Sequence, residues 1–272
     1  MDFKNIISKR TFPLILLNSI TLIFTIVVNY FGGTGIWGKP SVGDISNIYP
    51  TLITPASYAF SIWGIIYLLL IAYIGHQWYR FGIKKPRVVN EAGLWFTLSN
   101  LANAAWIYFW LQEMQGISVM VIFFLLFCLI QLVIRHRLEI FQPKFRYIAL
   151  VWWPICIYVG WIILAATVNT SVWLSSSANL EQLLDPEIWT VAVIAVATSV
   201  YIFLIFHRNM REAALVGVWG FIAIAVKQAA SPSVQSASVI AAAILLVYAG
   251  YHAYQNRATL PHQQLNKNQT FS

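Results

Sequence analysis

Residues 147–172 read YIALVWWPICIYVGWIILAATVNTSV, a stretch without a single charged side chain. A helix needs about 20 consecutive, mostly apolar residues to cross the hydrocarbon core of a bilayer. This stretch is long enough for such a span. It therefore predicts a transmembrane helix, and with it a membrane protein.

Seven further stretches are similarly apolar, and they lie at about 12–31, 55–79, 91–111, 116–134, 187–206, 212–230 and 233–254. The composition of the 272 residues agrees, because 59% are apolar and only 10% are charged. An average soluble domain has about 45–50% apolar and about 25% charged residues. This chain cannot cover a water-facing surface, which excludes a soluble globular enzyme, a disordered protein and a disulfide scaffold. We expect an all-α, polytopic membrane helix bundle of about eight transmembrane helices.

The basic residues indicate how this bundle is oriented. One expected side of the membrane holds both termini and alternate loops, and it carries 15 of the 17 basic residues: Lys4, Lys9, Arg10, Arg80, Lys84, Lys85, Arg87, Arg135, Arg137, Lys144, Arg146, Arg208, Arg211, Arg257 and Lys267. Lysine and arginine collect in cytoplasmic loops. We therefore expect cytoplasmic termini and a multi-pass protein of the plasma (inner) membrane. The same placement makes membrane orientation, rather than nucleic-acid binding, the reason for the net charge of +8.

Several helix starts carry capping residues. Thr54, Asp185 and Ser231 each precede a proline, and Asn90 precedes Glu91, so each of the four is expected to begin a helix. The loop at 32–54 is the longest on the other side and is large enough to cover a cavity. Cys128 and Cys156 have no CxxC spacing, and no histidine pair is spaced for a metal, so we expect neither a metal site nor a resident cofactor.

Aromatic and amide side chains fall deep inside three of the expected helices. They share helix faces, because Trp63 and Tyr67 are four residues apart, Asn103 and Trp106 are three apart, and Trp161, Ala165 and Asn169 are spaced by four. Polar groups at membrane depth face the bundle interior rather than lipid. The spacing leaves two interpretations open, which are hydrogen-bonded contacts between helices and a ligand pocket.

Three segments, in this order, carry a resemblance to a known family. They are Pro55 followed by Phe60-Ser61-Ile62-Trp63-Gly64-Ile65-Ile66-Tyr67, then Ala102-Asn103-Ala104-Ala105-Trp106 with Phe109 and Trp110, and then Tyr158-Val159-Gly160-Trp161 running on to Asn169. The chain resembles the TspO/MBR family of tryptophan-rich sensory or translocator proteins, in its longer branch. It departs from the family pattern at Ile157, where a proline is usual, in a longer first loop, and in three additional helices.

The resemblance implies a five-helix membrane module in 1–172, which leaves a three-helix extension in 173–256. The polar composition of 257–272 indicates a cytoplasmic tail. Family members bind porphyrins, sterols and synthetic aromatic ligands in a pocket between the second, third and fifth helices. The implied ligand-binding residues are Trp63, Tyr67, Asn103, Trp106, Trp161, Ala165 and Asn169. The implied function is binding of a planar hydrophobic molecule, such as a tetrapyrrole or a lipid, for sensing, sequestration or translocation.

Alternatives remain at this stage. Some family members are reported to degrade protoporphyrin in light, so a light-dependent enzyme is one alternative to a binding protein. A carrier or an accessory membrane subunit is another. A homodimer is also compatible with the resemblance, because some family members form one. No carboxylate or histidine lies at the expected pocket depth, so an enzyme that works in the dark is disfavoured. Lys227 lies inside the seventh expected helix near its outer end, where a Schiff-base lysine and a lysine that extends to the interface are the two readings.

Overall fold

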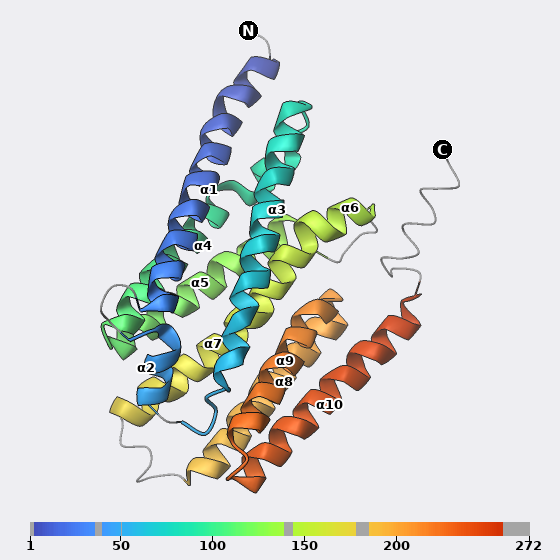
Figure 1. Cartoon of the computed structure of the whole chain (residues 1–272). Helices are drawn as coiled ribbons and strands as arrows, with labels where there is room; N and C mark the ends of the chain where they lie inside the picture. The colour runs from blue at the N-terminus through green and yellow to red at the C-terminus, as the bar shows by residue number, and fades with distance from the viewer. Residues whose placement is uncertain (1–2, 36–39, 50, 139–143, 178–184, 258–272) are drawn as a thin grey trace.

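The computed structural model describes residues 3–35, 40–49, 51–138, 144–177 and 185–257, and every regular element in these ranges is helical. Figure 1 shows the bundle that they form. The elements are α1 (Phe3–Thr34), α2 (Val42–Ile48), the 3₁₀ turn η1 (Ser57–Ser61), α3 (Ile62–Gly82), α4 (Arg87–Leu111), α5 (Gln115–Arg135), α6 (Phe145–Tyr147), the π turn η2 (Ile148–Trp152), α7 (Trp153–Ser177), α8 (Pro186–Arg208), α9 (Arg211–Lys227) and α10 (Pro232–Gln255).

Each of the eight apolar ranges expected from the sequence coincides with one long helical stretch. Six stretches are long and apolar enough to cross a membrane, at 11–34, 57–82, 115–135, 145–176, 186–208 and 232–255. The chain is therefore an integral, multi-pass membrane protein. The other two expected ranges are α4 and α9, which do not meet these criteria, so the number of eight spans stays a prediction.

Helix α9 has only 17 residues, so it is shorter than the six stretches above. More than half of the residues in each of α4 and α9 are buried inside the bundle, although both helices also keep exposed apolar side chains such as Leu94 and Val226. Helix α4 also carries buried polar side chains, among them Thr97, Ser99, Asn100 and Asn103, which lower its hydropathy. Polar residues are favoured at helix–helix contacts in membranes, where they find partners.

The helices form two groups in Figure 1, with α8, α9 and α10 packed together beside α1–α7. Helix α9 contacts α7 closely because glycines lie at the contact. A Cβ atom on Gly160 would lie 2.6 Å from the carbonyl oxygen of Ala213, and one on Gly220 would lie 2.0 Å from Cδ2 of Leu164. Small residues let helix backbones approach in this way.

The four expected helix starts have different outcomes. Thr54 is not a cap, because Ala56 is the N-cap residue of η1, the element that follows. Asp185 caps α8 as expected, because its Oδ1 accepts hydrogen bonds from the backbone N–H groups of Glu187 and Ile188 at 2.9 and 3.1 Å. Ser231 is the N-cap residue of α10, but its hydroxyl donates to Glu187 Oε1 at 2.6 Å instead of capping. Asn90 was the wrong start, since α4 begins at Arg87 and Asn90 lies within its first turns.

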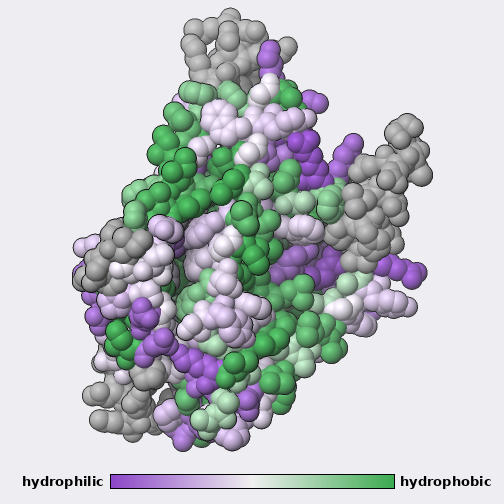
Figure 2. All heavy atoms as spheres, in the orientation of Figure 1, coloured by the Kyte–Doolittle hydropathy of each residue, from purple (hydrophilic) through white to green (hydrophobic). Residues whose placement is uncertain are grey.

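The outer surface fits a lipid environment. Figure 2 shows broad green apolar areas on the visible face, and purple hydrophilic side chains lie both near the end of α3 and toward the opposite, lower end of the bundle. Large apolar side chains such as Leu68 and Val247 are exposed on the helices. In lipid such exposure carries no cost, because the surrounding chains are themselves apolar.

Candidate functional site

Four tryptophans line a narrow cavity between α3, α4 and α7. They are Trp63, Trp106, Trp110 and Trp161, and Phe60, Ala165 and Asn169 also line it. The rings contact one another, since Trp63 meets Trp161 edge-to-face at 6.2 Å and Trp106 stacks on Trp110 at 5.9 Å. The cavity holds only about 30 Å³ of free space. Five of the seven sequence-predicted residues are thus brought together at this cavity, but they nearly close the space between them.

A short stretch of chain covers this cavity. We call residues 42–49 and 51–61, which contain α2 and η1, the cover segment. Its Val42, Ser46, Pro55 and Phe60 line the cavity, and the indole N–H of Trp110 donates to the carbonyl oxygen of Val42 at 3.1 Å. Sequence analysis identified the loop as large enough for a cover, but it did not foresee α2. The Ser41–Asp44 capping box that starts α2 was the available signal.

A second, larger cavity lies on the other side of Trp63. It has a volume of about 450 Å³, and Asn29, Tyr30, Asp44 and Tyr67 are among the residues around it. Trp63, Phe60 and Val42 line both cavities, so these three side chains form the partition between them. Trp63 also stacks on Tyr67, with ring centroids 5.4 Å apart and an interplanar angle of 15°.

Among the residues that the structure describes, three polar atoms at these cavities are buried and have no hydrogen-bond partner. They are the hydroxyl of Tyr67, the indole nitrogen of Trp161 and the hydroxyl of Ser46. Trp161 and Ser46 are each only 2% exposed. A buried polar group without a partner costs about 1–3 kcal/mol, so native proteins rarely keep one without a reason.

The predicted asparagines differ from these unpaired groups, because their side-chain amides form hydrogen bonds between helices. Asn103 Nδ2 donates to the Tyr158 hydroxyl at 2.8 Å, and Asn103 Oδ1 accepts from Asn29 at 2.6 Å. This joins α1, α4 and α7. Asn103 is fully buried and is not among the residues that line either cavity.

Asn169 and Trp106 form a second link. The Trp106 indole N–H donates to Asn169 Oδ1 at 2.9 Å, and the Asn169 amide donates to the Ser118 hydroxyl at 2.9 Å. The bonds join α4, α7 and α5. Both residues line the narrow cavity, yet their polar groups are already satisfied by the protein.

Residues of α9 and the residue that follows it bind the main chain of the cover segment. Gln228 Nε2 donates to the carbonyl oxygens of Thr51 and Thr54 at 3.3 and 3.2 Å, and the Trp219 indole donates to the carbonyl of Ala59 at 3.2 Å. The backbone N–H of Ala56 donates in turn to the carbonyl of Ala223 at 3.0 Å. The three-helix group is thereby attached to the segment that covers the aromatic cavity.

Comparison with known proteins identifies the family. A family model described as TSPO-like protein matches residues 15–251. The chain belongs to the TSPO-like protein family. The matched range extends into α10, so it includes the three helices beyond the first five. No curated protein and no solved structure matches the chain.

This TSPO-like protein also contains a charged cluster that the sequence analysis missed. Glu91 of α4 accepts from Arg87 Nε at 2.6 Å and from the Tyr147 hydroxyl at 3.1 Å, and its Oε2 lies 3.1 Å from Nδ1 of His136. His136 Nε2 lies 2.7 Å from the hydroxyl of Tyr73. The cluster ties together α3, α4, α5 and the start of the α6–α7 stretch.

His136 follows α5 and is completely buried. Burial lowers the pKa of His136, because the charged imidazolium loses water, while the Glu91 carboxylate partly opposes this shift. Its partners lie far away in the sequence, and no spacing rule connects them, which is why the cluster was missed.

Lys227 lies at the end of α9 in this TSPO-like protein. Its ammonium group donates a hydrogen bond to the side-chain oxygen of Asn47 in the cover segment. The side chain is exposed. This placement agrees with a lysine that extends to the interface.

Proposed function

We propose that this TSPO-like protein binds a flat, hydrophobic molecule, of tetrapyrrole or similar aromatic character, at the cavity around Trp63 and Trp161. The observation that carries the proposal is the unpaired indole nitrogen of Trp161 in a cavity lined by four tryptophans. Indole rings stack well on conjugated rings, and a few polar groups orient a ligand in an otherwise apolar pocket. The Trp161 N–H and the Tyr67 hydroxyl would donate to acceptor atoms of the ligand.

Ligand entry requires the partition to move. The narrow cavity of about 30 Å³ is too small for an aromatic ligand, whereas the neighbouring cavity of about 450 Å³ is within the range of small-molecule sites. Rotation of Trp63, together with displacement of Phe60, would join the two. Tyr67 and Trp161 would then face one continuous site from opposite sides of Trp63.

The two kinds of predicted residue would have different roles. Trp63, Tyr67, Trp161 and Ala165 would contact the ligand. Asn103, Trp106 and Asn169, whose polar groups are paired, would hold α4 and α7 at the spacing that the site needs. Both interpretations of the sequence pattern thus apply, each to a different subset of residues.

The three-helix extension would serve the same site. Through Gln228, Trp219 and Ala223, α9 would keep the cover segment in place over the cavity, and we place all eight helices across the membrane with both termini in the cytoplasm. In this arrangement the extension in 173–256 contacts the module in 1–172 through α9 and the cover segment, so the two parts act together.

The test is a titration of detergent-purified protein with protoporphyrin, followed by quenching of tryptophan fluorescence and by the visible absorption of the porphyrin. We expect saturable binding that weakens about tenfold in Trp161→Phe, because this variant keeps an aromatic ring and loses one buried hydrogen bond. Trp63→Ala should weaken binding further, since it removes the stacking surface.

Trp95→Phe is the matched control. Trp95 lies on α4, contacts Phe127 and lines neither cavity. It should bind as the unaltered protein does. Absence of saturable binding, or equal weakening in Trp95→Phe, would contradict the proposal. Illumination of the complex separates binding from the enzymatic alternative, because only an enzyme would consume the porphyrin and give a new absorbing product.

A further inference from the structure

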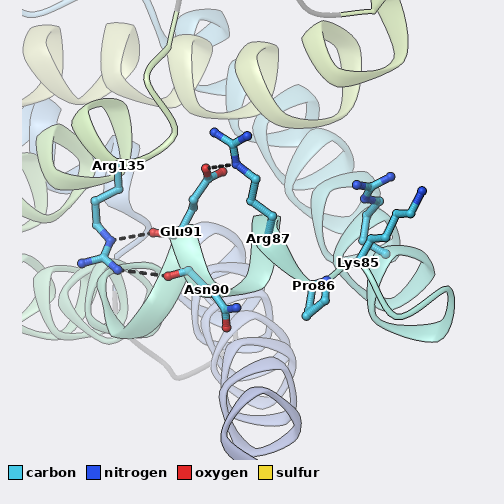
Figure 3. Close-up of a pocket in the computed structure, with 7 residues that line it drawn as sticks. Lys85, Pro86, Arg87, Asn90, Glu91 and Arg135 are labelled. Carbon is cyan, nitrogen blue, oxygen red and sulfur yellow. Dashed lines mark hydrogen bonds and ion pairs between the residues drawn. The ribbon is translucent and has the colours of Figure 1, made fainter. Parts of the chain in front are cut away.

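A third hollow lies where the turn between α3 and α4 meets the end of α5, apart from the two aromatic cavities. It has a volume of about 550 Å³ and is lined by Arg80, Lys85, Pro86, Arg87, Asn90, Glu91 and Arg135. Figure 3 shows Arg135 on one side of Glu91 and Arg87 on the other, with Lys85 beyond Arg87. None of these residues lines the aromatic cavities.

The hollow carries an excess of positive charge. Four of its side chains are cationic and one is a carboxylate, and that carboxylate is already engaged by Arg87, His136 and Tyr147. Within the described ranges, no carboxylate lies within ion-pair distance of Arg80, Lys85 or Arg135. Three cations therefore face this region without a compensating acid.

Arg135 is fixed in position by a kink in α4. Gly93 has φ 52° and ψ −142°, which interrupts the helix at a conformation that suits only glycine. Arg135 Nε donates to the carbonyl oxygen of Glu91 at 2.8 Å, and its terminal nitrogen donates to that of Asn90 at 3.0 Å. A guanidinium has five N–H donors, so three of them remain for a ligand.

The surroundings are those of a lipid-facing membrane end. Leu94 lies one turn after Asn90 and is 54% exposed, and Ile134 precedes Arg135 and is 53% exposed. A ligand with a phosphate among the cations and hydrocarbon chains along these apolar side chains would satisfy both parts of the surface. Guanidinium and ammonium groups bind phosphate oxygens through charge-assisted hydrogen bonds.

We infer that this hollow binds the phosphate group of an anionic phospholipid, with Arg80, Lys85 and Arg135 as the cationic contacts. Such a lipid would hold the α3–α4 turn against the end of α5 and is independent of any ligand at the tryptophans. Basic residues near a membrane surface attract anionic lipids with about 1 kcal/mol each, which is the scale of effect expected here.

The experiment is native mass spectrometry of the full-length protein in detergent with added phosphatidylglycerol or phosphatidylcholine. We expect retention of phosphatidylglycerol over phosphatidylcholine, and a loss of about tenfold or more in an Arg80→Gln, Lys85→Gln double variant. The control is Lys84→Gln with Arg137→Gln. It removes the same charge from two exposed residues that do not line the hollow, and it should retain the lipid.

Three outcomes would overturn the inference. Equal retention of both lipids would show that the hollow does not select an anionic headgroup, and equal loss in the two double variants would show that only the net charge of the protein matters. Saturable binding of inorganic phosphate that displaces phosphatidylglycerol from the hollow would assign the site to a soluble anion instead. The side chains of Arg80 and Lys85 make no described hydrogen bond, so we expect the double variant to stay folded. A melting curve of each variant checks this.

Discussion

The polar cluster around Glu91 and the aromatic cavities differ in how their buried polar groups are paired. In the cluster around Glu91, both nitrogens of His136, both oxygens of the carboxylate and the hydroxyls of Tyr73 and Tyr147 have partners. At the aromatic cavities, Tyr67, Trp161 and Ser46 each keep a buried polar atom unpaired. The first arrangement holds helices together, whereas the second costs stability in the absence of a ligand. The difference separates a structural polar site from one suited to binding.

The largest loss of stability is expected from a substitution in the cluster around Glu91. Glu91→Ala removes the acceptor of Arg87 and Tyr147 and leaves His136 with one partner fewer. Breaking a partly buried charged network by removing one member costs about 3–5 kcal/mol. Thermal unfolding in detergent should show a large loss for Glu91→Ala. Glu113→Ala, at an exposed position that contacts Tyr49, should show little. Comparable losses would mean that the cluster is not a structural centre.

A second substitution tests whether the cover segment over the aromatic cavities depends on the position of α9. Gly160→Ala would place a methyl group 2.6 Å from the main-chain oxygen of Ala213, which cannot move without displacing α9. We expect a loss of about 1–3 kcal/mol in thermal stability. We also expect greater quenching of tryptophan fluorescence by acrylamide as the cover segment loosens.

Gly75→Ala is the control for this helix contact. A Cβ atom at Gly75 would meet nothing within 4 Å, and alanine is the better helix former by about 1 kcal/mol. The protein should stay as stable or become more stable. Destabilisation of both variants to the same extent would remove the argument for close α7–α9 contact.

Two tyrosines allow the comparison in its sharpest form. Tyr67 has an unpaired hydroxyl, whereas Tyr158 accepts a hydrogen bond from Asn103 at 2.8 Å. Tyr67→Phe should leave the free energy of unfolding unchanged or raise it by about 1 kcal/mol, while it weakens porphyrin binding. Tyr158→Phe should lower the free energy of unfolding by about 1 kcal/mol instead. Loss of stability in both variants would show that the Tyr67 hydroxyl has a structural partner.

The smallest effect concerns pH. Burial holds the pKa of His136 below its ordinary value, so the unfolded chain binds a proton at a higher pH than the folded protein does. The stability contributed by neutral His136 is therefore complete above the unfolded pKa of about 6.5 and decreases as the pH falls below it. Melting temperatures between pH 7.5 and 5 should decline for the unaltered protein. His136→Asn should reduce that decline, and an unchanged slope would contradict the assignment.

Much of the fold follows from local sequence patterns. Each of the eight apolar ranges coincides with a helical stretch, and Asp185 caps α8, because apolar length and capping act over a few neighbouring residues. The start of α4 was misplaced at Asn90, since a capping side chain was present but the turn through Pro86 begins the helix earlier. The kink at Gly93 was also not foreseen, because a glycine within an apolar run is compatible with both a regular helix and a kink.

The site was less accessible to sequence reasoning. Shared helix faces predicted which aromatic residues come together, and five of the seven predicted residues line one cavity. The spacing could not distinguish Asn103, whose amide is saturated, from Trp161, whose indole is unpaired. That distinction depends on Asn29 and Tyr158, which lie in other helices, and on α2, whose position over the cavity depends on contacts with α4.

The attachment of the cover segment has a consequence for how such proteins diversify. Gln228 and Trp219 bind carbonyl oxygens of Thr51, Thr54 and Ala59, which every amino acid provides. The side chains of the segment that line the cavity take no part in this attachment. Substitutions there would change the shape and chemistry of the binding surface while the backbone stays in its place. Ligand preference could then diverge among relatives by mutation in a short stretch of chain, without loss of the scaffold that presents it.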